Sequence, residues 1–253
     1  LAGLLAGLVA FAPAAWLARA VSQATDGRVL LADARGTLWA GDAVVVLTGG
    51  AGSRNAAALP GRLHWALGWR GGGLDLALQQ PCCLHGSPRL HIAPGLATLT
   101  VTLAPDDDAS SRVGHWPAAW LAGLGTPWNT LELGGDLRLA ADRLRFERQD
   151  GGWLAHGSAQ LELAGISSRL STLPTLGSYR LQIDAGARGS PALALALTTD
   201  EGPLLLDASG QWAASGLRLR GEARAASGAE AALDHLLNII GRRQGERSLI
   251  AIG

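Results

Sequence analysis

The chain has 253 residues, equal numbers of basic and acidic side chains, a formal net charge of zero and two cysteines. A balanced charge gives no argument for a polyanionic partner such as nucleic acid, and two cysteines are too few for a disulfide scaffold. The length suits one β-rich domain with a substantial core, so we expect a single folded unit.

The first 18 residues, LAGLLAGLVAFAPAAWLA, are apolar and carry no charge. A helix of that length would reach about 27 Å, close to the hydrocarbon thickness of a bilayer, and Trp16 stands at its end like an interfacial anchor. Small-x-small patterns at 18–20 and 22–24 leave a cleaved signal peptide as the alternative. We therefore expect a transmembrane signal anchor over residues 1–24 and an exported β-rich domain over 25–253. Because the sequence has no methionine, we also expect the natural start to lie upstream.

After Gly27 apolar and polar residues alternate, which is typical of half-buried strands. In GRLHWALGW, for example, Trp65 and Trp69 share one face with two leucines. The alternation predicts strands at 37–48, 61–69, 73–80, 87–92, 96–103, 131–140, 142–148, 152–164, 177–185, 192–199, 203–212 and 215–226. Glycine-rich turns between them favour hairpins, and charge along the polar faces favours a single sheet with one wet side. The predicted fold is thus mainly β, a curved and twisted antiparallel meander.

Two segments interrupt the alternation. VGHWPAAWLAGLG, residues 113–125, has apolar residues at helical spacing after a proline and predicts a short helix. SGAEAALDHLLNIIGRR predicts a C-terminal amphipathic helix in which Ser227 and Glu230 form a capping box and Gly241 occupies the C′ position. The last residues, RSLIAIG, predict a final strand that returns into the sheet.

The sequence lacks the signatures of common enzymes, including the Gly-x-Ser-x-Gly elbow, the His-Glu-x-x-His pair and, because there is no lysine, the Walker loop. Trp39, between Gly36 and Gly41, has no nucleophile or base beside it, so we interpret it as a packed side chain in the first strand. The aspartates in APDDDASSR, residues 104–112, lack the later bidentate carboxylate of a calcium loop and indicate a solvated turn. We expect no catalytic residues, no metal and no cofactor.

Cys82 and Cys83 are adjacent, with His85 and His91 nearby. These are zinc-ligand residue types, but structural zinc sites usually separate paired ligands by two to four residues, and adjacent strand residues point to opposite faces. The remaining alternatives are a vicinal disulfide between Cys82 and Cys83, a bond to another chain, or two small buried thiols.

Several stretches, taken in order, resemble one known family. They are a membrane anchor followed by GTLWAGDA, GRLHWALGW, LGTPWNTLELGGDLRL, LGSYRL, GPLLLDASGQW, LRLRGEARA and LLNIIGRRQGERSLIAIG. In order and spacing these are similar to the type II secretion system protein N family, over nearly the whole chain. The resemblance implies a bitopic inner-membrane protein of a Gram-negative bacterium with a periplasmic β-domain. It also implies an accessory role beside other secretion subunits, and it supplies no catalytic residues.

Two functions are compatible with this resemblance. The first is a scaffold that docks another secretion subunit through a sheet edge or the polar face. The second is a lipid-binding groove of AsmA-like type, formed by the apolar face of a strongly coiled sheet. Whether the predicted apolar face is covered or lines an open trough separates the two; the residues concerned are Trp65, Trp69, Leu133, Leu137 and Leu181.

Overall fold

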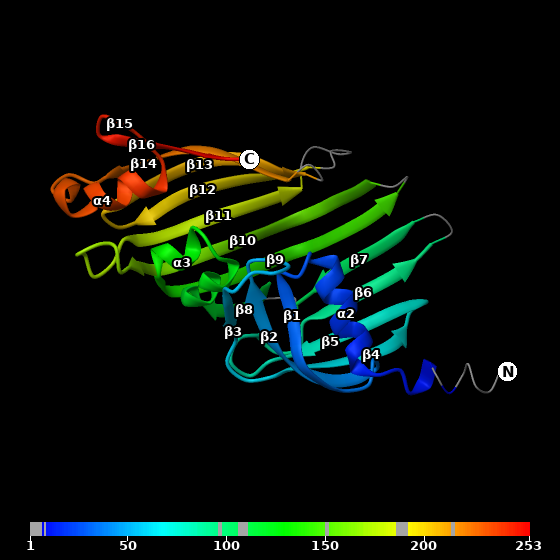
Figure 1. Cartoon of the computed structure of the whole chain (residues 1–253). Helices are drawn as coiled ribbons and strands as arrows, with labels where there is room; N and C mark the ends of the chain where they lie inside the picture. Colours follow the sequence, from blue (N-terminus) through cyan, green and yellow to red (C-terminus); the bar gives the residue numbers. More distant parts are fainter. Residues whose placement is uncertain are drawn as a thin grey trace.

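The computed structural model describes residues 7, 9–95, 98–105, 111–149, 152–185, 192–213 and 216–253. Over these residues the chain forms one antiparallel sheet of 16 strands with a few short helices (Figure 1). The strands are β1 (Val29–Gly36), β2 (Ala40–Thr48), β3 (Ala56–Ala58), β4 (Leu63–Arg70), β5 (Gly73–Gln79), β6 (Arg89–Pro94), β7 (Leu99–Ala104), β8 (Arg112–Pro117), β9 (Leu133–Gln149), β10 (Gly152–Ser168), β11 (Gly177–Ala185), β12 (Leu193–Glu201), β13 (Leu204–Ala213), β14 (Gly216–Ala225), β15 (Arg242–Gln244) and β16 (Arg247–Ile252). The helices are α2 (Ala14–Ala24), the 3₁₀ helix η1 (Ala118–Leu124), α3 (Trp128–Leu131) and α4 (Glu230–Ile240). The expectation of a mainly β, antiparallel fold is confirmed.

Most strands pair with the strand before them in the chain, as hairpin-forming turns predict. Across the sheet the order is β1-β2-β4-β5-β6-β7-β9-β10-β11-β12-β13-β14-β16-β15, with β3 added to β2 and β8 added to β9. Figure 1 shows these strands following one another across a broad, twisted surface. Such a meander needs only short connections, which explains why the alternation in the sequence located most of its strands.

Cross-strand pairing separates an apolar face from a polar one. Leu161 of β10 pairs with Leu181 of β11, which pairs with Leu197 of β12, so one row of leucines crosses three strands. The next row carries charge: Glu162 pairs with Arg180, and the carboxylate of Glu162 also lies 3.3 Å from the guanidinium of a β9 arginine. Opposite charges directly across a sheet stabilise it modestly, and they keep this face wet.

β9 is one strand of 17 residues, whereas the sequence predicted two, at 131–140 and 142–148. The register against β10 shifts between His156 and Ser158, so three steps along β9 oppose two along β10. A bulge of this kind reverses the alternation, and Leu144 therefore packs in the same cluster as Leu139 despite the odd spacing between them. The reversed alternation at the bulge explains why the sequence pattern suggested two strands where the structure has one.

The predicted short helix over 113–125 is only partly correct. Residues 112–117 form β8, which pairs with residues 136–140 of β9, and the helix η1 begins at Ala118. Pairing with a distant strand overrides the local helical spacing of the apolar residues.

The predicted C-terminal helix is present as α4, but its capping was wrong. The N-cap is Ala229 and no side chain makes a capping hydrogen bond there, so Ser227 and Glu230 form no capping box. Gly241 is extended, with φ −168°, instead of left-handed. A Cβ on Gly241 would lie 2.5 Å from the carbonyl oxygen of Leu249, so close approach to β16 explains the glycine.

The N-terminal end differs from the expected order. β1 precedes the strand predicted as the first, and Trp39 lies in the turn between β1 and β2. α2 begins only after Pro13, whose backbone is extended, and Ala12 and Ala14 are buried against the sheet. Within the described residues no helix has the length and apolar character needed to cross a bilayer. The predicted anchor over 1–24 starts in residues 1–6 and 8, which lie outside the described part.

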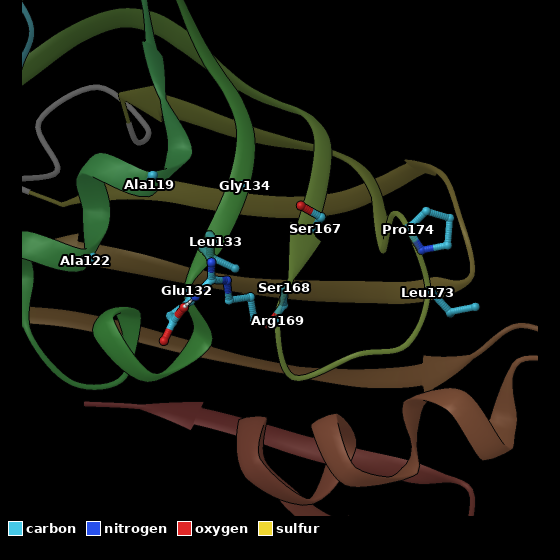
Figure 2. Close-up of a pocket in the computed structure, with 10 residues that line it drawn as sticks. All are labelled: Ala119, Ala122, Glu132, Leu133, Gly134, Ser167, Ser168, Arg169, Leu173 and Pro174. Atoms are coloured by element: carbon cyan, nitrogen blue, oxygen red, sulfur yellow. Dashed lines mark ion pairs between the residues drawn. The ribbon is translucent and has the colours of Figure 1, made fainter.

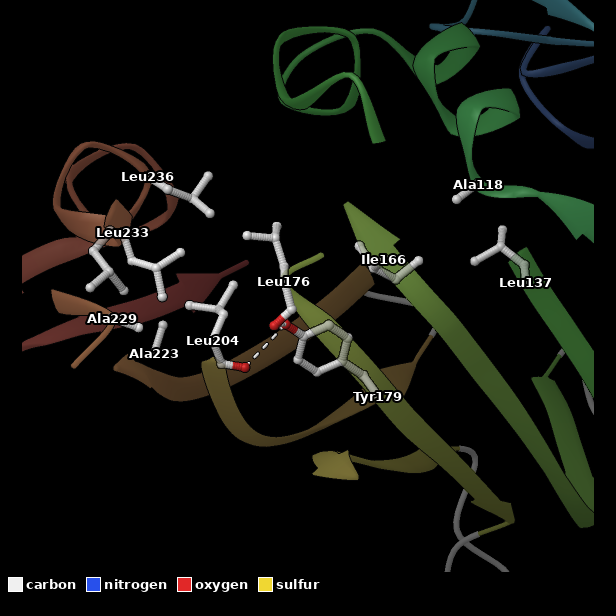
Figure 3. Close-up of a cluster of buried hydrophobic side chains, with 11 residues drawn as sticks. Ala118, Leu137, Ile166, Leu176, Tyr179, Leu204, Ala223, Ala229, Leu233 and Leu236 are labelled. Atoms are coloured by element: carbon white, nitrogen blue, oxygen red, sulfur yellow. Dashed lines mark hydrogen bonds between the residues drawn. The ribbon is translucent and has the colours of Figure 1, made fainter. Parts of the chain in front are cut away.

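The largest core cluster lies on the apolar face of strands β9 to β14, with α4 over one end of it and Ala118 of η1 beside Leu137 at the other (Figure 3). Leu233, Leu236 and Leu237 of α4 are each at most 1% exposed. They pack with Leu204 and Ala223 of the sheet, which buries the apolar stripe of the amphipathic helix. Since burial of this area is the main driving force for folding, this cluster fixes α4 on the sheet.

Candidate functional site

The structure divides the five predicted apolar-face residues among different surroundings. Leu137, 5% exposed, belongs to the largest core cluster, and Leu133 packs against that cluster. Leu181 is half-buried between two leucines of neighbouring strands. Trp65 is 4% exposed in a separate cluster, while Trp69, on the same strand, is 71% exposed. The five residues therefore do not line one continuous trough.

Trp65 is covered by the N-terminal segment. Its ring packs with Ala14 and Leu17 of α2, and its indole N–H points to the carbonyl oxygens of Thr37 (3.3 Å) and Leu38 (3.2 Å). A buried indole N–H needs such an acceptor, so this tryptophan is fixed in place and is not available to a ligand.

The other end of the apolar face is covered by α4 and the connection between β10 and β11. There the Tyr179 hydroxyl is within hydrogen-bond distance of the carbonyl oxygens of Leu176 (3.0 Å) and Leu204 (3.1 Å) (Figure 3). Burial raises the pKa of this hydroxyl well above its ordinary value, which keeps it protonated and able to donate. The Tyr179 hydroxyl thus links the backbone at Leu176 to the start of β13 inside an apolar core.

A cavity of about 560 Å³ lies where η1 and the start of β9 approach the end of β10 (Figure 2). An ion pair between Arg169 and Glu132 (3.0 Å) borders it, and both side chains are largely exposed. The Ser168 hydroxyl is already used, because it donates to the carbonyl oxygen of Leu131. None of the lining residues is a histidine or a cysteine, and the one carboxylate in the lining, Glu132, is paired with Arg169. The lining consists of Ala119, Ala122, Glu132, Leu133, Gly134, Ser167, Ser168, Arg169, Leu173 and Pro174.

Cys82 and Cys83 are joined to each other by a disulfide. Cys83 is 2% exposed and packs with Val45 and Leu59, and its carbonyl oxygen accepts a hydrogen bond from the backbone N–H of His115 (2.7 Å). The disulfide therefore lies in the connection between β5 and β6, at the point where this connection is hydrogen-bonded to β8. Among the described residues, no three His, Cys, Asp or Glu side chains are grouped as metal ligands. The acidic loop predicted as a solvated turn falls mostly on residues 106–110, outside the described part.

The C-terminal edge of the sheet was not singled out from the sequence. β14 pairs with β16 from Arg247 to Ile252, whereas β15 pairs only with residues 247–249. In the part of the chain that the structure describes, residues 250–252 thus have a strand on one side only. Trp212 (56% exposed) and Leu217 (38%) are cross-strand partners nearby, and Ile252 is 45% exposed. The sequence signal at this edge was the strand predicted in RSLIAIG, which the structure places at β16.

A family model described as type II secretion system (T2SS), protein N, matches residues 27–249. The chain belongs to this family. No curated protein and no solved structure matches it. Membership assigns the chain to type II secretion, in a family of secretion-machinery components that is not a known enzyme family.

Proposed function

We propose that this protein is an accessory inner-membrane component of the type II secretion system whose periplasmic β-domain docks another subunit. In this proposal residues 1–24 attach the chain to the membrane and the domain over 25–253 serves as a scaffold. The observation that carries it is the half-paired strand β16 at the C-terminal edge, next to exposed apolar side chains.

A half-paired strand offers unsatisfied backbone N–H and C=O groups to an incoming strand, and natural proteins usually protect such edges. Here the protection is incomplete, since β15 covers only residues 247–249 of β16. Leu219 pairs with Ile252 and lies two residues from Leu217, so Ile252, Leu217 and Trp212 share one face at the corner of the sheet. Backbone pairing would supply affinity, and this apolar corner would supply specificity.

Two matched variants test the docking edge. Ile252→Arg puts a charge on the edge, and Ile239→Arg is the control, because Ile239 is exposed to a similar extent (42% against 45%) but lies on α4. We expect Ile252→Arg to abolish crosslinking to other secretion subunits in native membranes and to reduce secretion, and Ile239→Arg to change neither. Equal crosslinking by both variants would contradict the proposed edge.

The lipid-binding groove is the second candidate, and one observation favours it. Leu181 and the strands β6 and β7 are largely half-buried, and they lie between the parts of the face that α2 and α4 cover. The covering helices count against a long open groove, because α2 packs on Trp65 and η1, through Ala118, lies beside Leu137 (Figure 3). Mass spectrometry of the extracted protein decides: stoichiometric phospholipid would support the groove, and its absence would leave the scaffold as the only candidate.

A further inference from the structure

Exposed apolar side chains gather at the N-terminal end of the domain as well as at the C-terminal edge of the sheet. Within the described residues nine large apolar side chains are exposed, and three of them belong to the N-terminal segment: Val9 (52%), Phe11 (80%) and Trp16 (44%). Trp69, on β4, is 71% exposed. Single exposed apolar residues need no explanation, but several aromatic residues at one end indicate an interaction surface.

The N-terminal segment is clamped to the turn between β1 and β2. The indole N–H of Trp39 donates to the carbonyl oxygen of Val9 (2.8 Å), and the backbone N–H of Leu38 donates to that of Ala12 (2.7 Å). Pro13 and Thr37 form a β-bridge between these two contacts and α2. These bonds hold residues 9–13, with their exposed side chains, at a fixed place on the domain.

Trp69 projects beyond the same turn. Ala66 of β4 pairs with Ala40 at the start of β2, and the backbone N–H of Leu67 donates to the carbonyl oxygen of Trp39 (2.6 Å). β4 continues past this point to Arg70, so Trp69 lies about 7 Å further along the strand. In Figure 1 the start of the described chain and the far end of β4 are on the same side of the molecule.

We propose that this end of the domain rests on the bilayer, with Phe11, Trp16 and Trp69 at the boundary between headgroups and acyl chains. A bilayer is the partner that the sequence favours for this surface. Residues 1–8, LAGLLAGL, are uncharged and apolar and lead directly into the clamped segment. Aromatic rings favour this boundary, where one side is apolar and the other wet. Arg19 is exposed, and Arg70 is 69% exposed despite an ion pair with Asp75 at 4.0 Å, so both can contact anionic headgroups.

The inference rests on the proposed function, since it takes the N-terminal segment as attached to the membrane. It adds how the β-domain is oriented relative to the membrane surface. A linker between anchor and domain would let the domain tumble, whereas the clamp at Val9 and Ala12 leaves none. Between β4 and β16 lie nine strands of the sheet order. At the usual strand spacing the docking edge is about 48 Å from β4, measured along the sheet. The edge is therefore presented to the periplasm while the opposite end lies on the membrane.

Spin labels on two matched tryptophan positions test this orientation. The full chain is reconstituted into phosphatidylethanolamine–phosphatidylglycerol vesicles as Trp69→Cys or, as the control, Trp212→Cys, each with a nitroxide. Cys82 and Cys83 are bonded to each other, so the introduced cysteine is the only free thiol. Trp212 is also exposed (56%) but lies near the docking edge. Circular dichroism verifies that both variants fold.

We expect the label at 69 to collide preferentially with lipid-soluble oxygen and the label at 212 with a water-soluble nickel chelate. Equal, water-like accessibility at both positions on protein that floats with the vesicles would overturn the inference and leave the proposed function standing. Protein that does not float at all would refute the membrane attachment in the proposed function, and the inference with it. Shielding of position 69 that appears only after another secretion subunit is added would identify a protein contact and would also overturn the inference.

Discussion

The two ends of the sheet are closed by different means. At the C-terminal end β13 and β14 pair in one unbroken register from Leu204↔Ala225 to Ala213↔Gly216, and α4 covers them with three fully buried leucines. At the N-terminal end the register of β1 against β2 shifts after Ala32, and Asp33 has a positive φ of 49°. Burial of apolar area dominates the first end, and directional polar contacts shape the second.

The polar contacts at the N-terminal end centre on one arginine. The Arg62 guanidinium donates to the carboxylates of Asp42 and Asp33, the latter at 2.9 Å, and also to the backbone carbonyl oxygen of Asp33 (2.6 Å). Arg35 donates to the same Asp33 carboxylate (2.6 Å). These bonds hold the irregular part of β1 beside β2, where an ordinary ladder is interrupted. Hydrogen bonds depend on geometry while apolar burial does not, so the two ends should respond to different perturbations.

The largest effect is expected from Leu237→Ala, in α4. Leu237 is 1% exposed, and removal of a buried leucine side chain should lower the free energy of unfolding by about 2–5 kcal/mol. Chemical denaturation measures the loss, and hydrogen exchange locates it: amides of β14 and β16 should exchange faster while those of β2 do not. Ile239→Ala is the control, because Ile239 is 42% exposed on the same helix. A uniform rise in exchange would show that the two ends do not differ in this way.

Tyr179→Phe should have the next largest effect. It removes the hydroxyl that reaches the carbonyl oxygens of Leu176 and Leu204, at a cost of about 1–1.5 kcal/mol in the free energy of unfolding. Because burial raises the pKa of the hydroxyl in the folded state, its contribution is complete below the ordinary pKa of 10.0 and is lost as the pH rises above it. The gap between wild type and variant, measured by denaturation, should therefore narrow in alkaline solution. A gap that widens there would contradict this reading of Tyr179.

The same contrast explains which parts of the fold the sequence predicts. β10 to β14 were located because their alternation is local and each strand pairs with its neighbour. β1 was missed because VLLADARG loses its alternation at Asp33, where the backbone turns to positive φ. β8 was assigned to a helix because its partner residues in β9 lie between 19 and 28 positions further along the chain. The alternation of apolar and polar residues therefore predicts the strands that pair with their neighbours in the sequence, and it fails for strands that are irregular or pair with a distant strand.

The candidate site was less predictable than the fold. Alternation correctly put Trp65 on the inner face, but it cannot say which part of that face another element covers. The covering element at Trp65 is α2, in a segment that the sequence predicted as part of a membrane anchor. Trp69 has the same periodicity and stays exposed because β4 extends beyond the turn that α2 approaches. Which part of an apolar face is covered depends on contacts between residues far apart in the sequence. The alternation of apolar and polar residues along one strand carries no information on such contacts.

The vicinal disulfide offers a smaller perturbation, at a buried cluster that includes Val45 of β2. It closes a minimal ring, so its loss in Cys82→Ala should lower the free energy of unfolding by about 1 kcal/mol or less. Cys83→Ala should cost about 1 kcal/mol more, since Cys83 is 2% exposed and loses packing against Val45 and Leu59 as well. Denaturation of both variants measures the difference. Equal losses would mean that the packing of Cys83 contributes nothing beyond the bond.

The smallest effect is expected at the polar end, from Asp33→Asn. Asparagine tolerates positive φ as aspartate does, so the substitution removes the charge and keeps the backbone. Hydrogen bonds from Arg35, and then Arg62, hold the pKa of Asp33 below its ordinary 3.8. A depressed pKa means that the carboxylate stabilises the fold above that value and that this contribution is lost as the pH falls through the lower native pKa.

Wild type should therefore exceed Asp33→Asn in stability at pH values above the ordinary pKa of 3.8, and the two should converge as the pH falls below it through the lowered native pKa. Denaturation at a series of pH values measures this, with Leu237→Ala as the comparison because no titrating group is changed there. Since the Asp33 side chain is 55% exposed, salt should screen the difference and reduce it further. A difference independent of both pH and salt would mean that Asp33 acts through its backbone conformation alone. The N-terminal end of the sheet would then be stabilised by the backbone conformation at Asp33 and not by the charge of its carboxylate.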